Sequence, residues 1–265
     1  MNGGPGPQAP GIREVAGVEV AGLGHRFGAL EVIERLDLTV AEGELVGLVG
    51  PSGCGKSTLL ELIAGLESPS AGSVRVGGES DSQRRLARCA YMPQRDLLLP
   101  WLSAIDNAAL ALRNRGAGRA DAREQAAPLF ARFGLTGFEG SRPGELSGGM
   151  RQRVAFVRTL LSGKPVLLLD EPFASLDAIT RAEMQEWLAA ALAAEGRTVV
   201  LVTHDVEEAL YLCDRVVILR SRPARALAEL RSPIPRALPR SETVTDAAFV
   251  AVRERALEAL REGSR

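Results

Sequence analysis

The stretch GPSGCGKST, residues 50–58, constrains the fold of this chain because it follows the apolar run 44–50 and precedes the helical pattern 56–66. It matches the spacing G-x-x-x-x-G-K-[ST]. In this spacing glycines let backbone N–H groups approach phosphate oxygens, and a helix N-terminus favours negative charge. The alternative is a glycine-rich turn with a surface lysine, which needs no strand before it or helix after it. The sequence therefore predicts a phosphate-binding loop, formed by Gly50, Pro51, Ser52, Gly53, Cys54, Gly55, Lys56, Ser57 and Thr58.

Two kinds of strand pattern surround this loop. The segments that alternate apolar and polar residues are 15–27, 35–40 and 73–76. The continuously apolar segments are 44–50, 165–170, 198–204 and 215–220. Alternation is typical of half-buried antiparallel strands, and continuous runs are typical of parallel strands covered on both faces. Helical patterns separate the apolar runs. The sequence thus predicts an α/β fold with a parallel sheet wrapped by helices, joined to an N-terminal antiparallel β-subdomain.

The remaining segments are less regular. Residues 97–145 carry no strand pattern and are expected to be helical, with 113–127 as a loop leading into a helix. The Gly- and Pro-rich residues 1–14 are expected to form a disordered leader. Near the other end, a proline-punctuated connection (231–241) precedes an amphipathic helix. The apolar residues of that helix, at steps of three and four, are Phe249, Val252, Ala256 and Leu260.

Composition narrows the class of partner. The formal net charge is −1, which is a poor match for nucleic acid. No apolar run approaches the roughly 18 residues of a membrane span. The three cysteines are scattered without a metal-binding spacing, which favours a reducing compartment. We therefore expect a globular protein that binds neither DNA nor a structural metal.

Two acidic residues end the apolar run VLLLDEP (166–172). Asp170 can hold Mg²⁺ directly or through water, together with Ser57, and Glu171 can orient or deprotonate an attacking water. Alone, these residues could form an ordinary turn that closes a strand. His204 ends another apolar run, at the sheet edge where ligands of open α/β sheets bind. It is predicted to contact the γ-phosphate or the attacking water, although a lone histidine is often structural.

A second possible anion site lies in ELSGGMRQ, residues 145–152. Ser147, Gly148 and Gly149 open a helix with an apolar face, which leaves backbone amides exposed at its N-terminus. Ser147 could equally be an ordinary N-cap. One triphosphate rarely needs two such sites in one domain. Two copies of the chain arranged head to tail would instead use each other's Ser147 segment to cover the bound nucleotide.

Together, GPSGCGKST, LSGGMRQ, LLLDEP, SLDA and THD occur in the order in which they are found in ATP-binding subunits of ABC transporters, and the chain resembles that family over residues 15–222. The resemblance implies a P-loop NTPase fold, the ABC cassette, with a helical subdomain near 95–150 and a C-terminal extension over 223–265. It also implies hydrolysis of ATP with Mg²⁺ in a head-to-tail homodimer.

The resemblance assigns roles to three further residues. Gln94 would sense Mg²⁺ and face a membrane partner, and Asp177 would lie in the loop that crosses the dimer. Phe27 stands where the family stacks an aromatic ring, usually Tyr, on adenine; a core Phe is the alternative. Ser175 replaces the Ala that is common before Leu176.

Closer resemblance comes from RDLLLPWLSAIDN (95–107) and FASLDAITRAEMQEWL (173–188). Both resemble the importer subgroup for nitrate, sulfonate and taurine and the subunits for pyrimidine precursors of thiamine. This implies separate permease subunits, a solute-binding protein, no nucleic acid, and a peripheral position on the cytoplasmic face of the plasma membrane. The alternatives are a soluble ABC ATPase acting on DNA or ribosomes, and a P-loop kinase or GTPase.

The cluster LLLPW (97–101) follows Gln94 directly, and Pro100 interrupts any regular helix or strand there. We expect this cluster to dock a short cytoplasmic helix of the permease, with Trp101 as the main anchor. The alternative is that Trp101 caps the core of the helical subdomain.

Overall fold

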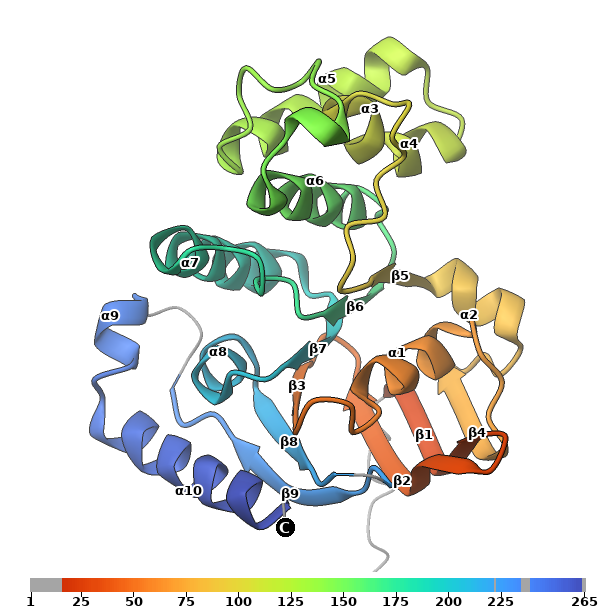
Figure 1. Cartoon of the computed structure of the whole chain (residues 1–265), viewed down its shortest axis with the longest axis vertical. Helices are drawn as coiled ribbons and strands as arrows, with labels where there is room; N and C mark the ends of the chain where they lie inside the picture. Colours follow the sequence, from red (N-terminus) through yellow and green to blue (C-terminus); the bar gives the residue numbers. More distant parts are fainter. Residues whose placement is uncertain (1–15, 222, 235–238, 264–265) are drawn as a thin grey trace, which may run out of the picture.

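A computed structural model describes residues 16–221, 223–234 and 239–263. The predicted leader 1–14 lies outside the described residues. The described residues form a six-stranded sheet, a three-stranded sheet and helices on both sides of the larger sheet (Figure 1). This confirms the α/β fold with an N-terminal antiparallel sheet. Among the described residues, no helix combines the length and the apolar character needed to cross a bilayer.

The larger sheet has the strand order β5-β6-β7-β3-β8-β9. Its strands are β3 (Leu45–Val49), β5 (Cys89–Met92), β6 (Val166–Asp170), β7 (Thr198–Thr203), β8 (Arg215–Leu219) and β9 (Ala226–Arg231). The first five are parallel, and β9 pairs antiparallel with β8. Every residue of β3, β6, β7 and β8 is buried, which explains their continuous apolar runs.

The smaller sheet has the order β2-β1-β4, with both pairs antiparallel. Its strands are β1 (Ala16–Phe27), β2 (Leu30–Ala41) and β4 (Ala71–Val76). In β2, Leu36, Leu38 and Val40 are buried while the residues between them are exposed. The alternating sequence pattern therefore reflects a strand with one face packed on the core and the other face exposed to water.

The helices divide between the sheets and an upper helical layer (Figure 1). Near the sheets lie α1 (Lys56–Ala64), α2 (Ser82–Arg88), α7 (Ala178–Glu195), α8 (Val206–Leu212), α9 (Arg240–Thr243) and α10 (Ala247–Gly263). The upper layer contains α3 (Ala104–Ala108), α4 (Leu110–Asn114), α5 (Arg119–Arg132), the 3-10 turn η1 (Pro143–Glu145) and α6 (Gly148–Leu160). Helix α5 already begins at Arg119, so the expected loop 113–127 is wrong over most of its length.

Alternate residues of the buried strands face two separate cores. Leu167 and Leu169 of β6 pack with the helical layer, α7, α8 and α10, whereas Val166 and Leu168 pack with α1 and the smaller sheet. Phe249 of α10 is fully buried in the first of these cores. The segment after residue 222 therefore continues the main sheet through β9 and covers it with α10, and the boundary expected at 222 stays a prediction.

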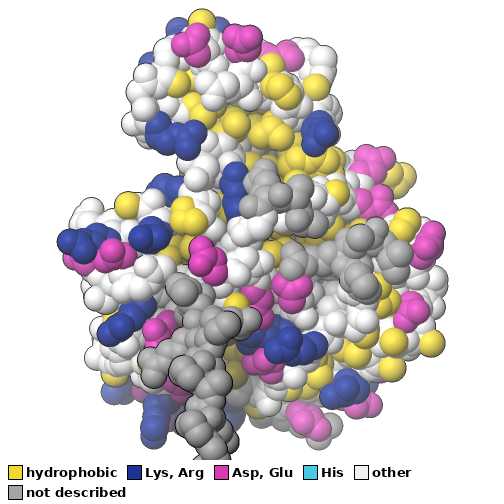
Figure 2. Space-filling model, turned by 180° about the vertical axis from the view of Figure 1, so that it is seen from behind, with side chains coloured by type: hydrophobic (Ala, Val, Ile, Leu, Met, Phe, Trp, Pro, Cys, Tyr) yellow, Lys and Arg dark blue, Asp and Glu magenta, His cyan; other side chains and the backbone are white. Residues whose placement is uncertain are grey.

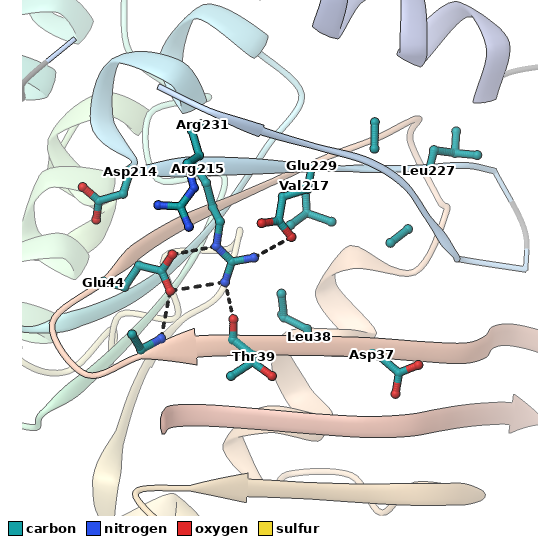
Figure 3. A pocket seen from close by; sticks show the side chains of 13 residues that line it. Asp37, Leu38, Thr39, Glu44, Asp214, Arg215, Val217, Leu227, Glu229 and Arg231 are labelled. Carbon is teal, nitrogen blue, oxygen red and sulfur yellow. Dashed lines mark hydrogen bonds and ion pairs between the residues drawn. The ribbon is translucent and has the colours of Figure 1, made fainter. Parts of the chain in front are cut away.

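A large pocket lies away from the phosphate-binding loop, between β2 and the β8–β9 pair (Figure 3). Its volume is about 880 Å³. The buried guanidinium of Arg215 pairs there with Glu44 at 2.6 Å and with Glu229 at 2.8 Å, and donates to the carbonyl of Thr39. These bonds tie the smaller sheet to the larger one and pair the charges at the centre of the pocket. We assign this pocket a structural role.

Candidate active site

The phosphate-binding loop joins the buried end of β3 to the first turn of α1. Gly53 and Gly55 have φ values of 72° and 111°, a region that favours glycine. A Cβ on Gly50 would lie 2.8 Å from the carbonyl oxygen of Leu219. The loop therefore needs glycine for both its conformation and its fit against β8, as the phosphate-loop prediction requires.

Lys56 is the first residue of α1 and is 5% exposed. Its Nζ donates to the carbonyl oxygens of Gly50 at 2.8 Å and Pro51 at 3.0 Å. The ammonium is thus held at the start of the loop, inside a ring of backbone groups. Because α1 starts from Gly55 without a side-chain cap, its first amides point into the same space. Cation, amides and helix dipole together suit a polyphosphate.

Asp170 ends β6 and is 3% exposed. Burial raises the pKa of its carboxyl, while hydrogen bonds from the Ser57 and Tyr91 hydroxyls and the charge of Lys56 act in the opposite direction. Ser57 and Asp170 thus present a hydroxyl and a carboxylate oxygen side by side, a donor set that fits Mg²⁺ bound together with phosphate oxygens. The sequence reasoning missed Tyr91; its signal was a polar residue on the short strand before Gln94.

Glu171 brings the three predicted catalytic residues together. Its Oε2 lies 3.3 Å from Nδ1 of His204 and accepts a long hydrogen bond of 3.5 Å from Nε2 of Gln94. Its φ of 48° is unusual for a residue with a side chain, and a 2.8 Å bond from its N–H to the carbonyl of Val202 holds this turn against β7. The carboxylate, at the end of β6, therefore stands between residues that follow the two neighbouring strands, Gln94 after β5 and His204 after β7.

A pocket of about 300 Å³ lies between the phosphate-binding loop and Glu171. Phe27 and Leu30 line its apolar end, and the phosphate-binding loop, Gln94, Asp170 and Glu171 line its polar end. Phe27 is 49% exposed, so the alternative that it is a core residue is wrong. Its ring packs edge-on against His25, with centroids 4.7 Å apart. An apolar end beside a phosphate site suits a purine base, and the stacking itself stays a prediction.

The Ser147 segment and Asp177 lie elsewhere on the surface. Ser147 is the N-cap of α6, and its Oγ accepts from the N–H of Met150 at 3.2 Å. Asp177 likewise caps α7 by accepting from the N–H of Thr180 at 3.0 Å, and hydrogen bonds from Thr180 lower its carboxyl pKa. Ser147, Gly148 and Asp177 are exposed, and Gly149 is half-buried. The lining of the 300 Å³ pocket includes none of these four residues.

The cluster after Gln94 is split between core and solvent. Leu98 is buried in the core of the helical layer, but Leu97 is 59% exposed and Trp101 is 68% exposed. The alternative that Trp101 caps the core of the helical subdomain is therefore wrong. Phe138 is also exposed, and its segment lies beside the start of α3, because Ala104 and Ile105 donate backbone hydrogen bonds to Ser141 and Glu139. This part of the surface is apolar.

Known proteins are similar to this chain in sequence. The formylaminopyrimidine import ATP-binding protein of Halalkalibacterium halodurans is 48% identical over 202 residues, 76% of this chain and 78% of that protein. The aliphatic sulfonates import ATP-binding protein of Rhodococcus jostii is 47% identical over 247 residues, 93% and 94% of the two chains. The taurine import ATP-binding protein of Chromobacterium violaceum is 43% identical over 233 residues, 86% and 89% of the two chains.

Solved structures agree with the sequence matches. The ATP-binding cassette MJ0796, in a dimeric post-hydrolysis state bound to ADP and Pi, superposes with a TM-score of 0.74 at 28% identity, over 82% of this chain and 99% of that one. The profile of the family described as ABC transporter matches residues 33–174, which include the phosphate-binding loop, the Ser147 segment, Asp170 and Glu171. This chain belongs to the ABC transporter family and hydrolyses ATP.

Proposed function

We propose that this protein powers the import of a small solute through separate permease subunits, and that it does so by hydrolysing ATP between two head-to-tail copies. The observation that carries the chemistry is the meeting of Gln94 and His204 on one carboxylate oxygen of Glu171. A carboxylate fixed on two sides can orient a water and accept its proton. Glu171 would be that base, and His204 would contact the γ-phosphate or the water.

The other residues bind the nucleotide. Residues 50–58 would hold the phosphates through backbone amides and Lys56, and Phe27 would stack on the adenine. Mg²⁺, held by Ser57 and Asp170 with Gln94 nearby, would neutralise charge on the phosphates. Ser147, Gly148, Gly149 and Asp177 would act on the partner's nucleotide. Their exposure and their position outside the 300 Å³ pocket support such a role.

The solute class follows from the relatives named above, whose names specify sulfonates, taurine and formylaminopyrimidine. We propose a solute of this kind, a separate solute-binding protein and a peripheral position at the cytoplasmic face of the membrane. Neighbouring permease and binding-protein genes would support this reading over a soluble ATPase acting on nucleic acid. The distribution of charge also disfavours a partner such as nucleic acid. On the face shown in Figure 2, basic and acidic side chains of the described residues are interspersed and form no continuous basic surface.

Replacing the base tests the chemistry. Glu171→Gln keeps the size of the side chain but removes its basicity, so ATP affinity should persist while hydrolysis falls by roughly 10² or more. An ATP-bound dimer should accumulate, which size-exclusion chromatography would detect. Glu183→Gln, an exposed change of the same type on α7, is the control. Near-normal turnover of Glu171→Gln would remove this residue from the role.

Replacing the exposed tryptophan tests permease coupling. Leu97 and Trp101, in the segment after Gln94, are exposed, as is Phe138, and an exposed aromatic side chain there suits docking of a short helix of a partner. Trp101→Ala should leave the melting temperature and ATP binding of the isolated subunit nearly unchanged, because the side chain is mostly exposed. Co-purification with the permease and solute-stimulated hydrolysis should both drop. Unchanged co-purification would place the docking surface elsewhere.

A further inference from the structure

Behind His204, a row of hydrogen-bonded side chains leads into the C-terminal segment. Glu208 of α8 and Gln185 of α7 are 4% and 1% exposed. Nε2 of Gln185 donates to Oε2 of Glu208 at 2.9 Å, and Oε1 of Gln185 accepts from Nε of Arg240 at 3.0 Å. Both ends of the buried amide are thus paired, which fixes its orientation.

The inner end of this row holds the two neighbours of His204. The hydroxyl of Thr203 hydrogen-bonds the carboxyl of Glu208, and its oxygen accepts from the N–H of Asp205 at 3.1 Å. The carboxylate of Asp205 in turn caps α8 by accepting from the N–H of Glu208 at 3.2 Å. The carboxyl that Gln185 binds therefore holds the side chain of Thr203, which precedes His204, while the backbone N–H of Glu208 holds Asp205, which follows it.

The outer end is anchored by the C-terminal segment. Nη2 of Arg240 lies 2.5 Å from Oε1 of Glu207, and the backbone N–H of Arg240 donates to Oε1 of Glu186 at 3.0 Å. Arg253 of α10 reaches the other oxygen of Glu207 at 3.3 Å. Arg240 therefore touches both α7 and α8, whereas Arg253 reaches α8 at Glu207.

We propose that Arg240 is a positioning residue for hydrolysis, which acts through Gln185, Glu208 and Thr203 to hold the imidazole of His204 against Glu171. The proposal rests on the proposed roles of His204 and Glu171. Without Arg240, the buried Oε1 of Gln185 loses its donor, and an unpaired buried acceptor is costly enough to make the amide turn or move. The 3.3 Å contact between His204 and Glu171 would then lose its support from behind. The C-terminal segment thereby becomes part of the catalytic apparatus.

A matched pair of variants separates positioning from mere packing. Arg240→Gln removes the donor to Gln185, and Arg253→Gln removes the other cation on Glu207 but leaves Gln185 untouched. For Arg240→Gln, kcat should fall roughly three- to tenfold, the range expected for a coupled network, while KM for MgATP stays within about twofold. Arg253→Gln should stay near wild-type kcat. Equal effects of the two variants would overturn the proposal.

A double-mutant test identifies the target of Arg240. In the His204→Ala background, Arg240→Gln should cause no further loss of kcat, because the residue through which it acts is gone. If Arg240→Gln lowers kcat by the same factor in the wild-type and His204→Ala proteins, the inference is wrong. If Arg240→Gln lowers the melting temperature strongly, Gln185→Met removes both amide bonds at similar volume and should reproduce the loss of kcat; normal kcat there also overturns the inference.

This design keeps two failures apart. If His204→Ala leaves hydrolysis unchanged, the proposed role of His204 fails, and the inference fails with it. If His204→Ala lowers hydrolysis but Arg240→Gln does not, the proposed function stands and the positioning role of Arg240 is wrong.

Discussion

At the scale of single residues, burial shifts two carboxyls beside the catalytic centre toward their neutral form. Burial raises the pKa of Asp170 and raises the pKa of Glu208 to about 7. For Glu208, the negative charge of Asp205 acts in the same direction, while the hydrogen bonds from Thr203 and Gln185 and the charge of Arg181 oppose the shift. An acid that stays protonated in the folded state makes stability fall as pH rises, because the unfolded chain releases the proton first.

This gives a pH-dependent prediction for Glu208→Gln. Wild-type stability contains a contribution from neutral Glu208 that is fully present below the unfolded pKa of about 4.5 and is lost by about pH 7. The variant lacks this contribution. As the pH rises from about 4.5 to about 7, the free energy of unfolding of the variant should therefore increase relative to that of the wild type. The shift of the Glu208 pKa from 4.5 to about 7 corresponds to about 3 kcal/mol in total. Urea unfolding of both proteins at several pH values measures it; a difference that does not change with pH would contradict the prediction.

At the scale of elements, helix α6 is tied to the segment after Gln94. Nη1 and Nη2 of Arg158 donate to the carbonyls of Leu97 and Asp96 at 2.9 and 2.7 Å, and Nε of Arg151 lies 2.9 Å from Oδ2 of Asp96. Leu97 has a φ of 44°, which a side chain disfavours. The two arginines therefore hold a strained turn, and they connect the helix that Ser147 caps to the segment directly after Gln94, which contacts Glu171.

Arg158→Lys should loosen this turn. A lysine offers one point charge and cannot bridge two carbonyls as a guanidinium does, so Gln94 should lose its fixed position and kcat should fall by roughly three- to tenfold. Arg115 is a matched control, because it also clamps two carbonyls, those of Ser162 and Leu161, at the far end of α6. Steady-state hydrolysis and melting curves of both Lys variants make the comparison. Arg115→Lys should keep wild-type kcat, and an equal loss in both would contradict the role of Arg158.

The sequence predicted those helices and strands that are long enough to show a clear apolar run or an alternating pattern. The four fully buried parallel strands followed from their apolar runs, and β1, β2 and β4 followed from alternation. Strand β5 has four residues, too few to show a period, and β9 (ALAELR) has too few large apolar residues. Helices α2 and α8 have seven residues each, and they were missed because so short a segment does not show a helical period.

The site shows a similar division. Motif spacing identified Lys56, Asp170 and Glu171 because each follows directly from the end of a strand or the start of a helix. The contact of Glu171 with His204 requires β6 and β7 to be neighbours, which is a property of the sheet order. Tyr91 and Gln185 were missed, because the partners that give them a role are distant in sequence: Asp170 is 79 residues from Tyr91, and Glu208 is 23 residues from Gln185.

At the scale of the whole molecule, the proposed function divides the nucleotide site into two unlike halves on one chain. The phosphate-binding loop with Glu171 would form one half, and the exposed N-terminus of α6 with Asp177 would form the other. Helix α6 belongs to the core that the helical layer shares with the main sheet. A second copy rotated by half a turn would bring unlike halves together at two places.

Mixing two inactive variants tests this geometry. Ser147→Arg places a bulky cation at the N-terminus of α6, and Lys56→Ala disables the phosphate-binding loop, so each homodimer should fail to hydrolyse ATP. In a mixed dimer, one site carries both lesions and the other carries none. Random mixing should then restore up to about a quarter of wild-type activity, since half the dimers are mixed and each has one intact site. No recovery would indicate that each chain holds its complete site.

The pairing of β9 with β8 has a consequence for how this protein stays in solution. All five residues of β8 are buried, and β9 occupies its outer edge through an antiparallel ladder. A chain ending at residue 222 would leave the five buried residues of β8 as a sheet edge with unpaired amides and carbonyls. Apolar edges recruit strands from other molecules and begin aggregates. Pairing with β9 puts a strand of mostly exposed residues at that edge instead, which disfavours aggregation through β8.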